Sequence, residues 1–132
     1  MDCLIDIIFV LDQSASVGSN NFELMRSFVS GLIDRMDIHE SNTRVGLVTY
    51  SVGVRSAFNL GDHSSVSSLK SAISSIHYYG GYRDTAAALR HVRTVMLTSA
   101  AGDRPRHPNV VVVFTNGHSQ DASATVVSIV LN

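Results

Sequence analysis

Two apolar, β-branched segments constrain the fold of this chain more than any other feature. Residues 4–11 read LIDIIFVL and residues 109–115 read NVVVVFT. A strand that is apolar on both faces must be covered on both faces, as in the parallel sheets of α/β proteins. Both runs are far too short to cross a bilayer, so we expect no membrane insertion. Asp6 interrupts the first run, and its burial would require a hydrogen-bonding neighbour near the start of the strand.

Three segments carry the spacing of amphipathic helices, with apolar residues recurring every three or four positions. The first covers residues 21–36, where Asn20 offers an N-cap and Glu23 a capping-box partner. The second covers residues 66–76, and the third starts at about residue 85. Since these helices alternate with extended segments, the sequence predicts a layered α/β domain.

The remaining extended segments complete the expected sheet. Residues 44–51 and 52–58 predict an antiparallel hairpin that turns near Gly53, while residues 123–131 fit either a strand or a helix. The predicted fold class is therefore α/β, with a doubly wound, mostly parallel central sheet, one antiparallel edge strand, and helices on both faces.

Composition excludes several classes of protein. The chain has 132 residues, which allows one domain, and its ten basic and eleven acidic residues give a net charge of -1. Such a balance argues against a nucleic-acid binder that works by neutralising phosphates. Cys3 is the single cysteine, which excludes an internal disulfide framework and a cysteine-based zinc site.

A short polar motif follows the first expected strand. Asp12, Ser14 and Ser16 form the pattern D-x-S-x-S. In α/β sheets, ligands bind at the carboxyl ends of the strands, where this motif would lie. A carboxylate and two hydroxyls are hard oxygen ligands that suit Mg²⁺ or Mn²⁺. The alternative is that the three side chains only satisfy amides of the loop and of the following helix.

Four segments, in order, resemble the von Willebrand factor A domain. They are residues 6–18, residues 44–51, Gly80-Gly81 leading into residues 85–89, and residues 110–121. The similarity is greatest to extracellular-matrix members such as matrilins and the A domains of collagen VI. This resemblance implies a Rossmann-like fold that binds proteins and catalyses no reaction. It also implies a metal-ion-dependent adhesion site, in which an acidic residue of the partner completes the shell of the metal.

The resemblance transfers only part of that site to this chain. Asp12, Ser14 and Ser16 match the family's D-x-S-x-S ligands. The family's threonine falls on Arg83, and its aspartate in a T-D-G turn falls on Asn116. A cation and an amide therefore stand where the family has a hydroxyl and a carboxylate.

These departures predict a degenerate metal site. At about 5 Å and an effective dielectric of about 20, Arg83 would repel a divalent ion by about 6–7 kcal/mol, and Asp12 would attract it by a similar amount. We expect binding of Mg²⁺ or Mn²⁺ to be weak or absent, with Arg83 paired to Asp12 in place of the metal. A shift of the alignment by a residue or two would offer Asp84 or Thr85 as a substitute ligand.

The function implied by the resemblance is adhesion between proteins. We expect a non-enzymatic interaction domain of a secreted matrix protein, or of the extracellular part of a membrane protein. Its partners would be extracellular matrix proteins such as collagens or other proteins with this domain. Tyr79, Tyr82 and His118 lie in loops at the expected site and would form a partner-binding rim.

Two alternatives remain at this point. One is a purely structural domain that associates with itself and does not depend on metal. The other is a haloacid-dehalogenase-like phosphatase with Asp12 as the nucleophile. That family places an aspartate where this chain has Ser14, and the single lysine, Lys70, falls on a helix.

The family also bears on length. We treat residues 1–132 as one domain, and we expect it to lack the family's last strand and helix elements. The family's common C-terminal partner for a cysteine placed like Cys3 is absent from the sequence.

Overall fold

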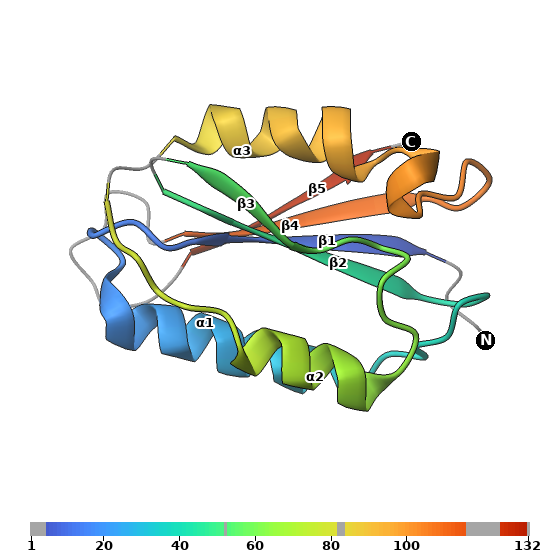
Figure 1. Cartoon of the computed structure of the whole chain (residues 1–132), viewed down its shortest axis with the longest axis horizontal. Helices are drawn as coiled ribbons and strands as arrows, with labels where there is room; N and C mark the ends of the chain where they lie inside the picture. Colours follow the sequence, from blue (N-terminus) through green and yellow to red (C-terminus); the bar gives the residue numbers. More distant parts are fainter. Residues whose placement is uncertain (1–4, 52, 82–83, 116–124, 132) are drawn as a thin grey trace.

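The structure, a computed structural model, describes residues 5–51, 53–81, 84–115 and 125–131. A five-stranded sheet lies between helices α1 and α2 on one face and helix α3 on the other (Figure 1). No helix in the described ranges combines the length and apolar character needed to cross a membrane. The strands are β1 (Asp6–Asp12), β2 (Arg44–Tyr50), β3 (Val54–Phe58), β4 (Asn109–Thr115) and β5 (Thr125–Leu131). The helices are α1 (Gly18–Ile33), α2 (Val66–Ser74) and α3 (Thr85–His91). Helix α3 continues as a π-helical segment (Val92–Met96), which a 3-10 turn follows (Ser99–Ala101).

The strand order is β3-β2-β1-β4-β5, with β1 parallel to both of its neighbours. The predicted fold class is confirmed, including the antiparallel β2–β3 hairpin. The expectation of one antiparallel edge strand was incomplete, since β5 pairs antiparallel with β4 at the opposite edge. Only residues 116–124 separate β4 from β5, and a parallel return would need a crossover of a dozen or more residues.

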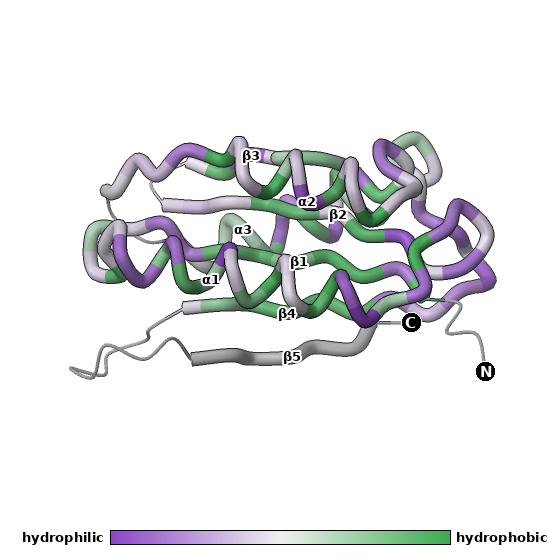
Figure 2. The backbone as a smooth tube through the Cα atoms, turned by 90° about the horizontal axis from the view of Figure 1, so that it is seen from below, coloured by the Kyte–Doolittle hydropathy of each residue, from purple (hydrophilic) through white to green (hydrophobic). Residues whose placement is uncertain are grey.

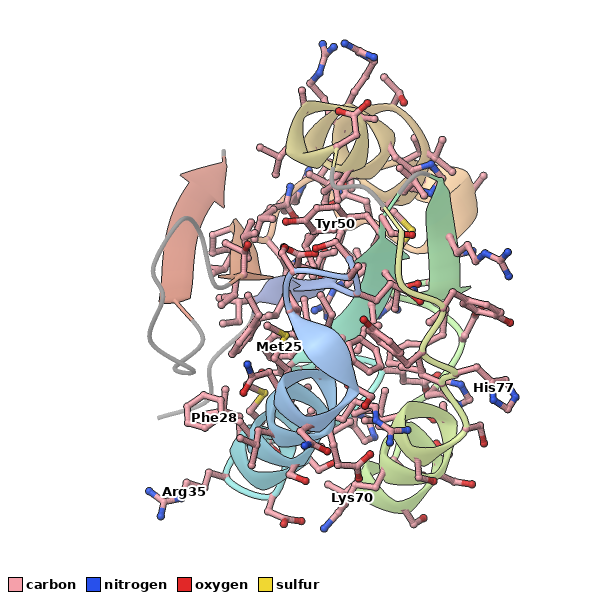
Figure 3. The ribbon with its side chains drawn as sticks, turned by 90° about the vertical axis from the view of Figure 1, so that its left-hand side faces the viewer. Met25, Phe28, Arg35, Tyr50, Lys70 and His77 are labelled. Atoms are coloured by element: carbon pink, nitrogen blue, oxygen red, sulfur yellow. The ribbon has the colours of Figure 1, made fainter. Side chains whose placement is uncertain are left out.

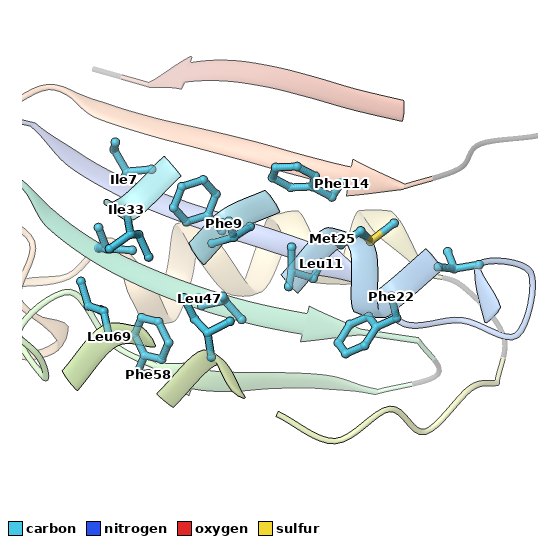
Figure 4. Packing of buried hydrophobic residues seen from close by; sticks show 14 residues of the cluster. Ile7, Phe9, Leu11, Phe22, Met25, Ile33, Leu47, Phe58, Leu69 and Phe114 are labelled. Carbon is cyan, nitrogen blue, oxygen red and sulfur yellow. The ribbon is translucent and has the colours of Figure 1, made fainter. Parts of the chain in front are cut away.

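Alternation along β1 divides the core into two layers. Ile7, Phe9 and Leu11 pack against α1 and α2 (Figure 4), whereas Ile8 and Val10 pack on the face that α3 covers. All five side chains are buried. The hydropathy view from the α1 and α2 side shows apolar strands beneath both helices (Figure 2). Each fully buried side chain of this kind stabilises the fold by about 1.5–3 kcal/mol.

Helix α1 starts earlier than its sequence pattern predicts. It begins at Gly18, its N-cap is Val17, and no side chain caps it, so the capping box of Asn20 and Glu23 was wrong. The amides of Val17 and Gly18 both donate to the carbonyl of Ser14. The turn that holds the polar motif therefore leads directly into the helix.

Candidate functional site

The three parallel strands end at one edge of the sheet. Strand β1 ends at Asp12, β2 at Tyr50 and β4 at Thr115, all at the left-hand end of the sheet in Figure 1. The register pairs Asp12 with Tyr50. Because carboxyl ends of parallel strands converge there, residues far apart in sequence lie together.

Asp12 occupies the centre of this edge and is fully buried. Its Oδ1 accepts a hydrogen bond from the backbone N–H of Ser14 at 2.9 Å. Its Oδ2 accepts one from Oγ1 of Thr115 at 2.6 Å. Both oxygens are thus engaged by donors from two elements, and hydrogen bonds to a charged acceptor are roughly twice as strong as neutral ones.

Ser14 and Ser16 lie beside Asp12 in the same loop. Their Oγ atoms are 2.9 Å apart. Ser14 is buried and Ser16 is exposed, so the two hydroxyls lie between the buried carboxylate of Asp12 and the solvent. The structure therefore brings together the three residues of the D-x-S-x-S motif.

Gln13, the spacer between Asp12 and Ser14, was not singled out by the sequence analysis. It is buried, and its backbone N–H donates to the carbonyl of Tyr50 at 2.8 Å. Its Oε1 accepts from the backbone N–H of Tyr79 at 3.0 Å. A glutamine at a spacer position carries no motif signal, and only its place between the strand ends reveals this bridging contact.

The loop before α3 also holds the motif in place. The hydroxyl of Tyr78 donates to the carbonyl of Ser14 at 3.0 Å, and the N–H of Ala15 donates to the carbonyl of Gly81 at 2.8 Å. The ring of Tyr78 packs on Phe22 of α1. The loop before α3 is therefore joined to the D-x-S-x-S loop by one hydrogen bond from a side chain and one between backbone groups.

The other predicted ligands are Arg83, Asn116 and Asp84, and the structure describes only Asp84. Arg83 and Asn116 lie outside the described residues, so the pairing of Arg83 with Asp12 stays a prediction. Asp84 is exposed, and its Oδ1 accepts from the N–H of Ala87 at 3.0 Å, which makes it the N-cap of α3. That oxygen is therefore used to cap the start of α3.

The predicted rim is described at one of its three positions. Tyr79 is 58% exposed, and the guanidinium of Arg55 lies over its ring, with Cζ 4.3 Å from the centroid. Tyr82 and His118 lie outside the described residues. Arg55 was missed by the sequence analysis, although its place in an edge strand marks it as a surface residue.

The donor chemistry of the site fits a hard divalent cation in part. Asp12, Ser14 and Ser16 supply one carboxylate and two hydroxyls, which Mg²⁺ and Mn²⁺ accept when water completes the shell. Within the described ranges, no group of three or more His, Cys, Asp or Glu could hold a metal. Any ion at this edge would therefore rely on hydroxyls and a single described carboxylate at the motif.

Comparisons with known proteins agree with this architecture. A profile of the von Willebrand factor type A domain matches residues 6–131. Matrilin-2 of Mus musculus is 40% identical over 120 residues, which cover 89% of this chain and 13% of that protein. Matrilin-1 of Homo sapiens is 38% identical over 116 residues, which cover 88% of this chain and 23% of that protein. The chain thus spans less than a quarter of the length of either relative.

Solved structures show the same arrangement. Proximal thread matrix protein 1 from the mussel byssus superposes with a TM-score of 0.82 and 28% sequence identity, covering 91% of this chain and 32% of its own. A second structure of that protein, with a zinc-occupied MIDAS motif, superposes with a TM-score of 0.81. With the profile match, the matrilin identity and this fold in agreement, the chain belongs to the von Willebrand factor type A domain family.

Proposed function

We propose that this chain is a non-enzymatic protein-interaction domain of a secreted, extracellular matrix protein, with a degenerate metal-ion-dependent adhesion site. The observation that carries the proposal is the assembly of Asp12, Ser14 and Ser16 at the carboxyl edge of the sheet, with Asp12 held by Thr115. The matrilin relatives are secreted proteins of the extracellular matrix, which supports this location. On the same likeness we propose partners of the same class, such as collagens or other proteins with this domain.

The metal dependence of this interaction is proposed to be weak or absent. If Mg²⁺ or Mn²⁺ binds, Asp12, Ser14 and Ser16 would hold it, and the ion would supply a positive centre for an acidic side chain of the partner. The zinc-occupied motif of the mussel protein supports divalent binding at this place in the fold. The sequence of this chain opposes it, because Arg83 and Asn116 replace a hydroxyl and a carboxylate of the family pattern.

The phosphatase alternative finds no support in the geometry. Both oxygens of Asp12 accept hydrogen bonds, so this buried carboxylate is held in place. Lys70 lies on α2, on the outer surface of the helical layer (Figure 3), and donates to both carboxylate oxygens of Asp34, the C-cap of α1. It therefore cannot serve a phosphoryl group at Asp12, and a phosphatase would need such a cation.

Binding of the chain to immobilised matrix proteins tests the proposal. Surface plasmon resonance against a panel of collagens and matrilins should detect at least one partner. A bulky cation at the exposed site position, in Ser16→Lys, should weaken that binding at least tenfold. Ser67→Lys, at an exposed serine of α2 towards the other end of the sheet, is the matched control and should leave it unchanged. Equal binding by both variants would show that the partner does not bind at this edge of the sheet.

A second candidate function is self-association, and strand β5 favours it. This strand forms one edge of the sheet and reads TVVSIVL, with no charged residue and no proline. Natural edge strands usually carry such residues to prevent pairing with another chain. Sedimentation of the chain at increasing concentration should show dimers if β5 pairs between copies, and a single monomeric species throughout would exclude this function.

A further inference from the structure

A cavity of about 330 Å³ lies beside the strand-end site, between strand β3 and the loop that follows α2. Its lining includes Thr49, Arg55, Ala57, Ser75, His77 and Tyr79. Among the described residues that line it are a guanidinium and an imidazole but no carboxylate. An anionic group would therefore meet a positive charge, and no negative charge, from these described residues.

Arg55, unlike two other cations of the helical layer, has no acidic partner among the described residues. Arg26 pairs with Glu23, and Lys70 pairs with Asp34. In the described part of the chain, the guanidinium of Arg55 makes no hydrogen bond or ion pair, and it lies over the ring of Tyr79. A guanidinium that lies over an aromatic ring can still use its N–H groups to bind a carboxylate through two parallel hydrogen bonds.

Tyr79 is fixed by the strand-end loop while its ring stays exposed. Its backbone N–H donates to Oε1 of the buried Gln13, and its side chain is 58% exposed. The ring of His77 meets it edge-on, with centroids 6.5 Å apart, and His77 points away from the body of the domain in Figure 3. The cation and the aromatic surface are thus positioned before any partner arrives, which lowers the entropic cost of binding.

We propose that this pocket binds an aspartate or glutamate side chain of a protein partner, through Arg55 and Tyr79 and without a metal ion. The inference rests on the proposed interaction function and names the chemistry of its partner. The size of the cavity suits one or two side chains. A sulfated polysaccharide would need a row of several cations, whereas Arg55 is the one arginine or lysine among the described lining residues.

The test uses a blocked pentapeptide, acetyl-Gly-Glu-Tyr-Glu-Gly-amide, and its counterpart with glutamine in place of both glutamates. In ¹⁵N NMR titrations, the acidic peptide should shift the amides of Arg55, His77 and Tyr79, with or without EDTA. The glutamine peptide should bind about tenfold more weakly, because it loses the charge-assisted contacts. Arg55→Gln should lose about the same factor, while Arg93→Gln, an exposed arginine on the α3 side of the sheet, should not.

Three results would overturn the inference. They are equal binding of the two peptides, unchanged binding by Arg55→Gln, and no shift with about 10 mM acidic peptide. A heparin tetrasaccharide that shifts the pocket amides more strongly than the peptide would assign the pocket to polysaccharide instead. The binding of whole matrix proteins, judged with Ser16→Lys, is measured separately. A failed peptide titration with intact matrix binding therefore rejects the pocket alone.

Discussion

The guanidinium of Arg104 clamps the carboxylate of Asp6 at the amino-terminal end of β1. Nε and Nη2 of Arg104 lie 2.9 Å and 2.6 Å from Oδ1, and the backbone N–H of Arg104 donates to Oδ2 at 3.0 Å. Asp6 is fully buried, and the Arg104 side chain is 13% exposed. The same guanidinium also donates to the carbonyls of Ile5 and Asn42, so one side chain joins three segments.

Because of this pair, substitutions at two nearby arginines should differ strongly in their effect on the free energy of unfolding. Arg104→Ala leaves the Asp6 carboxylate buried without its cation and should lower the free energy of unfolding by about 3–5 kcal/mol. Arg106→Ala, two residues further and exposed, should change it by less than about 0.5 kcal/mol. Urea unfolding followed by circular dichroism measures both. Similar values for the two variants would mean that the clamp contributes little to stability.

Substitution of alanine for each of two glycines should change the stability of the domain in opposite directions. Gly102 has a φ of 98°, and a Cβ built there would lie 2.4 Å from the backbone nitrogen of Gly61. Gly102→Ala should therefore cost at least about 1–3 kcal/mol. Gly31 lies within α1 with open space around it, so Gly31→Ala should stabilise the domain by about 0.5–1 kcal/mol. Thermal unfolding separates the two, and a stabilised Gly102→Ala would show that the loop can move apart.

The hydrogen bond from Thr115 to Asp12 predicts that loss of the Thr115 hydroxyl lowers the free energy of unfolding. Thr115→Val keeps the branched shape that suits β4 but removes the donor to a buried carboxylate, at a cost of about 1.5–3 kcal/mol. Thr94→Val removes an exposed hydroxyl that bonds only the carbonyl of Arg90 among the described residues, and should cost less than about 0.5 kcal/mol. Equal unfolding free energies for the two variants would contradict the role assigned to Thr115.

The sequence predicted the strands and helices well because their apolar periodicity is strong. It also placed Asp12, Ser14 and Ser16 together, since a motif that follows a buried strand lies at the sheet edge whatever else the chain does. It missed the start of α1, because the turn through Ser14 sets it and not a capping side chain. It left residues 123–131 undecided, because valine-rich segments suit a strand or a buried helix until a pairing partner is known.

Long-range contacts between side chains and backbone were beyond sequence reasoning. The bridge from Gln13 to Tyr79 and the stacking of Arg55 on Tyr79 join residues that no local pattern relates. Asp6 is the exception, since a carboxylate in a buried strand required a partner, and the structure confirms that requirement with Arg104.

The two departures from the family's ligand pattern predict that metal binding can be restored. Arg83→Thr combined with Asn116→Asp removes one cation and adds one carboxylate, which returns the family's ligand set to the site. This double variant should bind Mn²⁺ with a dissociation constant below about 1 mM. Tyr79→Ala is the control, because it alters the rim without adding a ligand and should not gain metal affinity. A double variant that still fails to bind would mean that other residues disable the site.

Calorimetric titration of the unmodified chain with Mg²⁺ and Mn²⁺ tests the central claim most directly. We predict no binding tighter than about 1 mM for either ion, together with partner binding that EDTA leaves unchanged. Sub-millimolar binding of either ion, or loss of partner binding on chelation, would contradict the account and show that Asp12, Ser14 and Ser16 form a working metal-dependent adhesion site.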